Sequence, residues 1–334
     1  MGRSADTLLI GGGFFGYANE ICAALRGRGR QAIWFEDRPS TDTLTKTAVR
    51  LAPRLTKKRS DRYFDRIISE NRGNPIQDVL VIKGEALSIS SIISLRAAWP
   101  RARFTAYFWD SYRNMPVDSR DKVSLFDAAF TFDSVDACHD SRLQYRPLFF
   151  IEEYARLPDR VRDIDVLFFG TAHTDRYDVL RRLSVALPQK IKFRRLLYFP
   201  SRLIYATQLL IKPGLLVASP EDLIFEPLEG PAVRELIART RIVVDIERPM
   251  QSGLTIRTIE MLGAGRKVIT TNDKICDAEF FDARNICVID RNCPIVTEEF
   301  LDSPYISPDA GVLQRYSLSG WLDDVLPATR THRM

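Results

Sequence analysis

Short, largely apolar runs alternate with amphipathic stretches along most of the chain. Continuous apolar runs rich in β-branched residues predict buried parallel strands, because a strand covered on both faces has no polar side. Such runs lie at residues 79–83, 103–108, 128–132, 165–169, 241–246, 267–271 and 286–289. Other stretches, such as 254–264, carry apolar residues at helical spacing. This alternation predicts an α/β protein with parallel sheets.

The chain of 334 residues is long enough for two domains that each bury a core. A charged stretch with two prolines, residues 146–164, is typical of a passage between domains. With βα alternation on both sides of it, the sequence predicts two Rossmann-like domains facing a cleft. We expect domains at 1–150 and 151–315, followed by a terminal helix and tail at 316–334.

Composition narrows the class of protein. With 45% hydrophobic and 27% charged residues the chain is typical of globular proteins, and a net charge of +5 is too small to indicate nucleic acid as a partner. The five cysteines show no paired spacing, which favours reduced thiols in the cytoplasm. No N-terminal signal is expected, because the apolar run at 7–10 is short.

The clearest candidate chemistry lies in a strand, loop, helix and strand at residues 241–272. Its loop brings Gln251, Ser252 and Gly253 to a helix N-terminus, where unpaired backbone N–H groups favour a phosphate. Arg257 and Glu260 then stand three residues apart on one helix face. Glu260 could accept hydrogen bonds from a sugar hydroxyl, or the two side chains could pair with each other on a solvated face.

A second loop of this kind follows the predicted strand 165–169. Its glycine-threonine turn leads into a helix, an arrangement that suits a phosphate or a nucleotide base. The turn and helix start contain Gly170, Thr171, His173, Asp175 and Arg176. A lone histidine such as His173 can equally be a structural hydrogen-bonding residue.

The segment 7–37 reads as strand, glycine turn, helix and strand. Its Gly11, Gly13 and Gly16 satisfy G-x-G-x-x-G, and Glu36 with Asp37 lies where a dinucleotide-binding fold keeps its ribose-binding acid. An oxidoreductase that uses NAD or FAD is therefore an alternative function. The glycines could instead only permit a tight turn beside a helix.

Two acids follow predicted strands of the first domain. Asp110 comes after 103–108, next to Trp109, and Glu85 comes after 79–83. Ligands of open α/β sheets bind beyond the carboxyl ends of strands, so either acid could serve as a general base. Asp110 could also be a helix N-cap or an ion-pair partner.

The stretch 189–218 mixes apolar residues with six lysines and arginines and contains two prolines. The prolines prevent a single membrane-spanning helix. Two interpretations remain: a segment that contacts an anionic inner membrane from the cytoplasm, and an apolar face packed into the domain with its cations in solvent.

Several motifs together resemble those of GT-B glycosyltransferases, and more closely a bacterial lipopolysaccharide and capsular polysaccharide biosynthesis group related to CgeB-like proteins. The motifs are YFWDSYRN, FTFDSVDA, FFGTAHTDRY, DIERPMQSGLTIRTIEMLG and YSLSGWL, which span most of residues 10–322. Glu260 matches the glutamate that holds the donor ribose in such enzymes. The family's second acid, eight residues earlier, is replaced by Ser252, and Glu247 lies upstream.

The resemblance implies a transferase that moves a sugar from a nucleotide-sugar donor to a cell-surface glycan, without a metal or cofactor. It also implies that the terminal helix crosses back to the first domain. The implied donor-binding residues are Gly170, Thr171, His173, Asp175, Arg176, Glu247, Arg248, Gln251, Ser252, Gly253, Leu254, Thr255, Arg257 and Glu260. On the acceptor side we expect Gly13, Phe14, Tyr17 and Trp109. A non-catalytic role in envelope assembly is a third possibility.

Overall fold

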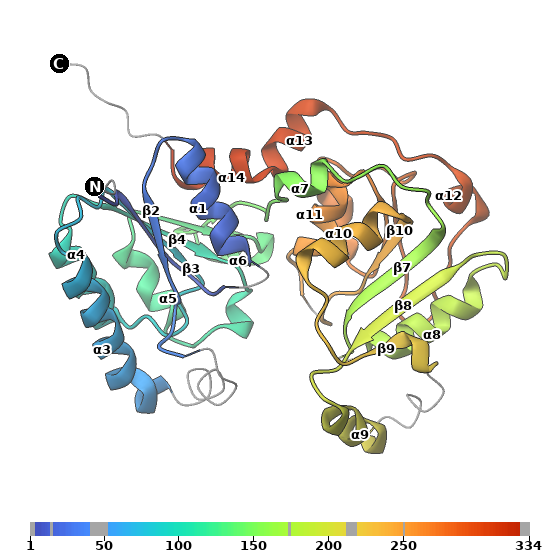
Figure 1. The fold of residues 1–334 in the computed structure, drawn as a ribbon, viewed down its shortest axis with the longest axis horizontal. Helices are drawn as coiled ribbons and strands as arrows, with labels where there is room; N and C mark the ends of the chain where they lie inside the picture. The colour runs from blue at the N-terminus through green and yellow to red at the C-terminus, as the bar shows by residue number, and fades with distance from the viewer. Residues whose placement is uncertain are drawn as a thin grey trace. The chain divides into compact units, whose positions relative to one another are not determined.

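The computed structural model describes residues 4–13, 16–40, 53–172, 175–211, 219–249 and 251–327, with the backbone alone at 53–56 and 210–211. The chain forms two compact units. Unit 1 comprises Met1–Leu148 together with Leu318–Met334, and unit 2 comprises Phe149–Ser317. Each unit is built around one parallel sheet (Figure 1).

The sheet of unit 1 has six parallel strands in the order β2-β1-β3-β4-β5-β6. The strands are β1 Thr7–Ile10, β2 Ala32–Phe35, β3 Asp78–Ile82, β4 Arg103–Phe108, β5 Ala128–Thr131 and β6 Gln144–Tyr145. Strand β1 pairs with β2 and with β3, so Thr7 lies between Ala32 and Asp78. The order of strands reverses between β1 and β3, and the carboxyl ends of these two strands define the switch point of unit 1.

Helices surround this sheet. They are α1 Tyr17–Gly27, α3 Pro53–Asn71, α4 Ile89–Ala98, α5 Ser119–Lys122, α6 Ser134–His139 and α14 Leu318–Val325, with short turns η2 Tyr112–Asn114 and η3 Val123–Leu125. The strands supply a core of buried aliphatic and aromatic side chains, among them Leu8, Val79 and Phe104. Continuous burial of β3 explains why residues 79–82 are all apolar, and the buried Asp78 at its start pairs with Arg30.

Helix α14, near the end of the chain, belongs to unit 1. Trp321 is fully buried and packs edge-on against Tyr107, with 4.8 Å between ring centroids. Arg146 forms an ion pair with Asp324, with 2.7 Å between the charged atoms. The prediction that the terminal helix returns to the first domain is therefore confirmed. The helix predicted from residue 316 begins at Leu318, because the chain is extended at Ser317, where the preceding helix ends.

The sheet of unit 2 has six parallel strands in the order β12-β11-β10-β7-β8-β9. The strands are β7 Ile164–Thr171, β8 Phe193–Tyr198, β9 Leu223–Ile224, β10 Thr240–Asp245, β11 Lys267–Thr270 and β12 Ile286–Val288. Here the order reverses between β7 and β10, so their carboxyl ends define the switch point of unit 2. Both sheets confirm the predicted α/β class with two Rossmann-like domains.

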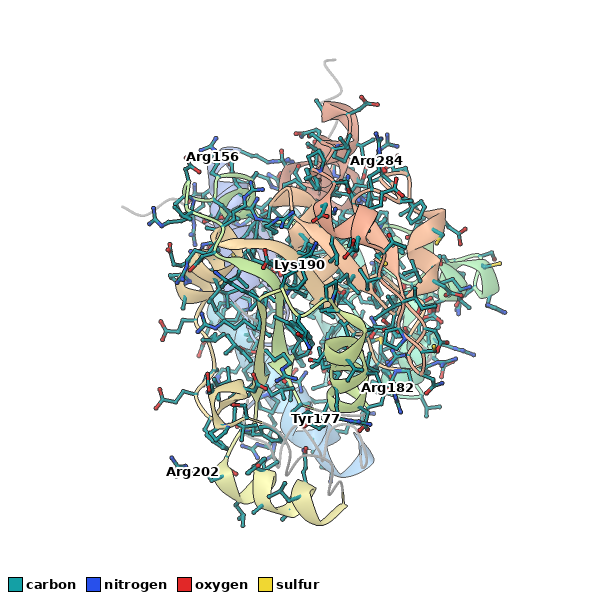
Figure 2. The ribbon with its side chains drawn as sticks, turned by 90° about the vertical axis from the view of Figure 1, so that its right-hand side faces the viewer. Arg156, Tyr177, Arg182, Lys190, Arg202 and Arg284 are labelled. Atoms are coloured by element: carbon teal, nitrogen blue, oxygen red, sulfur yellow. The ribbon has the colours of Figure 1, made fainter. Side chains whose placement is uncertain are left out.

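The remaining elements of unit 2 connect and cover these strands. They are α7 Glu152–Ala155, α8 Arg176–Ala186, α9 Arg202–Ile211, α10 Gly230–Ala238, α11 Ile256–Gly263, α12 Glu298–Asp302 and α13 Ala310–Tyr316, with η5 Pro220–Asp222 and η6 Asp273–Asp277. In Figure 2, Tyr177 and Arg182 mark α8, and Arg202 marks the start of α9. Tyr177 is buried in the core that α8 shares with the sheet.

The stretch 189–218 divides into two parts. Strand β8 lies inside the sheet with Leu196 and Leu197 buried. Helix α9 extends beyond the ends of β8 and β9 (Figure 1), and its Leu203 is 74% exposed. Among the described residues, no helix is both long and apolar enough to cross a membrane. Residues 212–218 lie outside the described ranges.

Candidate functional site

The two loops that the sequence singled out in the second domain meet at the switch point of unit 2. One follows β7 and the other follows β10, and Arg176 at the start of α8 joins them. Its Nε donates to the Ile246 carbonyl at 2.8 Å, and a terminal nitrogen donates to the Thr171 carbonyl at 3.1 Å. Gly170 and Thr171 themselves form the last residues of β7 rather than a loop, since they pair with β8.

The N-terminus of α11 lies at the end of β10. Asp245, the last residue of that strand, accepts hydrogen bonds from the hydroxyls of Thr255 and Thr258. The Thr255 hydroxyl in turn caps the Thr258 amide at 3.3 Å. The N–H groups of Ile256 and Arg257 are the other first-turn amides, which have no partner within a helix. The helix therefore presents donors and the positive end of its dipole at this edge.

Side-chain amides hold the loop that leads into α11. Gln251 donates to the Gly253 carbonyl at 3.0 Å, and Asn272 donates to the same carbonyl at 3.3 Å. These bonds fix the loop through its carbonyl oxygens and do not use its N–H groups. Gly253 and Leu254 are buried, whereas Ser252 and Thr255 are partly exposed.

Three arginines concentrate positive charge at this edge. Burial lowers the pKa of Arg176 to about 10; Asp245 opposes that shift, and the positive charges of Arg257 and Arg248 add to it. Arg257 stacks on the Phe169 ring, 3.3 Å from its centroid. Within the described residues, neither Arg176 nor Arg248 forms an ion pair. An anion at this edge would relieve the mutual repulsion of the three guanidinium groups.

Glu260 lies one turn into α11 and is buried, with 4% of its surface exposed. Arg257 donates to its carboxylate at 3.2 Å. Burial, and next the negative charge of Glu260, raise the pKa of the Tyr154 phenol. Arg257 and Glu260 do pair, as one interpretation of the sequence expected. Their side chains are 23% and 6% exposed, so the pair is not on a solvated face.

Glu247 has a different environment from Glu260. It is buried and accepts hydrogen bonds from the Thr271 hydroxyl at 2.6 Å and from Arg291. Burial raises the pKa of Glu247, although both partners act against that shift. Arg291 also pairs with Asp175 at 2.9 Å. Glu247 and Asp175 thus share one arginine that ties the loop after β10 to the start of α8.

Sequence reasoning missed two residues of this arrangement, Tyr154 and Arg291. Arg291 follows the last strand of the sheet, and that position was a usable signal, because carboxyl ends of parallel strands meet at one edge. Tyr154 lies in the one-turn helix α7 before the first strand of the unit. No pattern in the sequence connects it with Glu260.

In unit 1, the chain's own side chains occupy the glycine loop. Glu36 accepts from the Gly13 amide at 3.1 Å, and the Trp34 indole donates to the Gly11 carbonyl at 2.7 Å. A Cβ atom on Gly13 would lie 2.8 Å from the Glu36 carboxylate and 3.0 Å from the Trp34 ring. The acid that would hold a ribose in a dinucleotide-binding fold is therefore engaged with the loop itself.

The two candidate bases of unit 1 differ in exposure. The Asp110 side chain is 26% exposed and pairs with Lys83. Glu85 is buried with no side-chain exposure and pairs with Arg38, which also binds Asp37. Near Asp110, an aromatic pair is formed by Trp109 and Tyr17, whose ring centroids are 5.6 Å apart.

His173 and Phe14 lie outside the described residues. Within the described ranges, no group of three or more histidine, cysteine or acidic side chains is placed to hold a metal ion.

The two parallel sheets and the returning terminal helix define a GT-B-like fold. No family model matches the sequence, and no curated protein matches it. Similar solved structures include HepE of Anabaena in complex with UDP and glucose, with 10% identity, a TM-score of 0.59, and coverage of 96% of this chain and 98% of that one. A glycosyltransferase from Rickettsia africae has 13% identity, a TM-score of 0.60, and coverage of 96% and 97%.

A third similar structure is OtsA in its apo form, with 10% identity, a TM-score of 0.62, and coverage of 96% of this chain and 99% of that one. Each of these similarities covers 96% of this chain, so it includes both units. At such low identities they establish the fold. Membership of the CgeB-like polysaccharide group stays a prediction.

Proposed function

We propose that the chain is a metal-independent glycosyltransferase that moves a sugar from a nucleotide-sugar donor to a lipopolysaccharide, capsule or exopolysaccharide acceptor. One observation carries the proposal: three arginines and a helix N-terminus converge at the switch point of unit 2, with the buried Glu260 beside them. Positive charge suits a diphosphate, and a carboxylate suits ribose hydroxyls. A nucleoside diphosphate contains both a diphosphate and a ribose, so its binding site needs both positive charge and a carboxylate.

The donor diphosphate would lie against the loop at 251–255 and the first turn of α11. Arg176, Arg248 and Arg257 would offset its charge, which grows on the leaving group as the sugar departs. Glu260 would accept hydrogen bonds from the ribose. The similar fold of Anabaena HepE, which was solved with UDP and glucose, supports this class of donor.

We assign the acceptor side to unit 1, with Asp110 as the general base and Trp109 and Tyr17 beside it. In this reaction the acceptor hydroxyl gives its proton to Asp110, its oxygen bonds to the anomeric carbon, and the bond from that carbon to the diphosphate breaks. The exposure of Asp110 favours it over Glu85, whose carboxylate is buried against Arg38. Both carboxylates form ion pairs, but that of Asp110 with Lys83 is partly exposed, so an acceptor hydroxyl could approach it, whereas Glu85 is fully enclosed.

The alternative function, dinucleotide-dependent oxidation, has less support. Glu36 and Trp34 fill the glycine loop that NAD or FAD would need. In addition, the sheet of unit 1 has the order of strands found in flavodoxin-like folds, whereas the order typical of dinucleotide-binding domains occurs in unit 2.

A thermal-shift panel tests the proposal. Each nucleoside diphosphate, NAD and FAD would be added at the same concentration. A ligand of the folded state that is present at about 100 times its dissociation constant raises the melting temperature by a few degrees. We expect one nucleoside diphosphate to do so and Glu260→Ala to weaken that response. Stabilisation by NAD or FAD alone would favour the oxidoreductase. No response, with glycan output unaffected by Glu260→Ala, would favour an assembly role.

We also propose that α9 makes the peripheral contact with the cytoplasmic face of an anionic inner membrane. Leu203 is 74% exposed and Ile204 is 39% exposed, and the exposed Arg202 precedes them. Apolar side chains beside a cation suit the interface of an anionic bilayer. Strand β8 contributes nothing to this surface, because it lies within the sheet.

A further inference from the structure

We propose that Arg291 is a positioning residue, which holds the end of β10 and the start of α8 in the arrangement that binds the donor diphosphate. The inference rests on the proposed function, because it concerns how that site is held in place. Arg291 lies outside the two loops that the sequence assigned to the donor. Glu247 and Asp175, which the sequence predicted as donor ligands, would act on the diphosphate through Arg291.

The guanidinium of Arg291 contacts both segments. One terminal nitrogen donates to the two carboxylate oxygens of Asp175 at 3.0 and 2.9 Å. The other donates to the Glu247 carbonyl at 2.8 Å and also to the Glu247 carboxylate. Burial acts to lower the pKa of Arg291, but the hydrogen bonds and charges of Glu247 and Asp175 outweigh it and raise the pKa. Both terminal nitrogens are thus engaged by the protein, which suits a residue that holds segments together.

The backbone around Arg291 is itself held. Arg291 follows β12 in a turn where the Asp290 carboxylate accepts from the Asn292 and Cys293 amides at 2.7 and 2.8 Å. The carbonyl of Arg291 accepts from Arg182 of α8, labelled in Figure 2, at 3.1 Å. The Arg291 side chain is 20% exposed. The guanidinium therefore acts from a fixed support at the carboxyl edge of the sheet.

On the β10 side, these contacts determine where the chain enters the loop at 251–255. The Ile246 carbonyl accepts from Arg176 at 2.8 Å, and the next residue, Glu247, is held by Arg291 through both its backbone and its side chain. Arg248, which we assign to the diphosphate, follows directly. Two successive residues are thus fixed immediately before a phosphate-binding group.

On the α8 side, Asp175 directly precedes Arg176, the first residue of the helix. One guanidinium, that of Arg291, therefore fixes the neighbours of both Arg176 and Arg248. Groups that are already held in place lose less freedom when the ligand binds, and the ligand then binds more tightly. Removing Arg291 would release both arginines and weaken their contact with the diphosphate.

The test compares Arg291→Ala with the unmodified protein by calorimetric titration. The ligands are the nucleoside diphosphate that stabilises the protein in the panel and the matching nucleoside, which has no phosphate and is measured as a competitor of the diphosphate. We expect the dissociation constant of the diphosphate to rise about three- to tenfold and that of the nucleoside to stay the same. Arg291→Lys keeps the charge beside the buried Glu247 and should give the same pattern with a smaller loss, so it serves if Arg291→Ala does not fold.

A double-variant cycle with Glu247→Gln separates the indirect role of Glu247 from direct contact with the donor. If Glu247 acts through Arg291, adding Glu247→Gln to Arg291→Ala should weaken diphosphate binding no further. Losses that multiply would mean that Glu247 contacts the donor itself, and they would overturn its assignment to Arg291.

Arg195→Ala is the matched control. Arg195 pairs with Asp222 at 2.7 Å, and its side chain is 24% exposed, close to the value for Arg291. This pair joins β8 to η5 and does not involve the two loops. We expect both dissociation constants to stay unchanged. A melting curve for each variant establishes that the fold is retained.

The outcomes separate the two proposals. If no nucleoside diphosphate binds the unmodified protein, the proposed function fails and the inference fails with it. If one binds and Arg291→Ala leaves its dissociation constant unchanged, the inference alone is overturned. It is also overturned if Arg291→Ala weakens the diphosphate and the nucleoside equally, or if Arg195→Ala gives the same loss, because either pattern reflects a general disturbance of unit 2.

Discussion

At the carboxyl edge of the unit 1 sheet, Arg38 is neutralised by buried carboxylates, whereas at the same edge of unit 2 Arg176 donates to backbone carbonyls. In unit 1, Arg38 lies between the carboxylates of Asp37 and Glu85, all of them buried. In unit 2, Arg176 donates to two carbonyls and repels its neighbouring arginines. The comparison indicates that one parallel sheet can enclose an arginine in ion pairs at its carboxyl edge, while another leaves an arginine there outside any described ion pair.

The glycine-containing loops of the two units also differ in the side chains that surround them. Unit 1 has the full G-x-G-x-x-G pattern, yet Trp34 and Glu36 close onto it. Unit 2 has no such pattern, yet its loop leads to a helix whose first-turn amides lie beside arginines. The side chains that surround a loop decide whether a phosphate can reach it, and the spacing of glycines alone does not.

The largest effect is expected on the folding of unit 1. Arg38→Ala would leave two buried carboxylates without their partner, and breaking a buried ion pair in this way costs about 3–5 kcal/mol of unfolding free energy. In the folded protein, burial lowers the pKa of Arg38, but the hydrogen bonds and charges of Asp37 and Glu85 outweigh this effect and raise it. Urea denaturation measures the change.

Arg284→Ala is the control for that experiment. Arg284, labelled in Figure 2, pairs with Asp282 at 2.6 Å, but its side chain is 62% exposed. Exposed pairs contribute little to stability, so we expect almost no change. If Arg38→Ala and Arg284→Ala lower the unfolding free energy equally, burial of the Arg38 ion pairs does not account for their contribution to stability.

The next effect is expected on binding at unit 2. Arg176→Ala would remove a charge that we assign to the diphosphate, and lost charge-assisted hydrogen bonds of this kind weaken binding about 10- to 100-fold. Calorimetric titration with the nucleoside diphosphate measures the loss. Arg156→Ala is the control, because Arg156 pairs with Glu152 on the surface, and its side chain is 76% exposed. An unchanged affinity in Arg176→Ala would remove this arginine from the site.

Much of the fold could be predicted from the sequence, because buried parallel strands are largely apolar. The run at 79–83 became β3, and that at 241–246 became β10. Strand β8 was harder, since its Arg194 and Arg195 give it the appearance of a basic surface segment. Strand order could not be predicted either, because it depends on which edge each new strand joins.

The candidate site was predictable where it is local in sequence. The spacing of Arg257 and Glu260 on one helix, and the polar loops after two strands, located the edge of unit 2. Contacts between distant segments were not predictable: Arg291 joins Glu247 to Asp175 from beyond the last strand, and Arg38, three residues after β2, pairs with the buried Glu85. Whether a carboxylate is available or enclosed depends on such contacts, and the sequence pattern is the same in both cases.

The smallest effect concerns apolar surface, where the two units can again be compared. Leu203 on α9 of unit 2 and Ile93 on α4 of unit 1 are both exposed apolar residues on helices, at 74% and 55%. If α9 contacts an anionic bilayer, Leu203→Glu should lower binding to phosphatidylglycerol-containing vesicles about three- to tenfold, because it removes apolar burial and adds a repelled charge. Ile93→Glu adds the same charge elsewhere and should change binding little. Vesicle sedimentation measures both, and equal losses in the two variants would mean that net charge, rather than α9, governs the interaction.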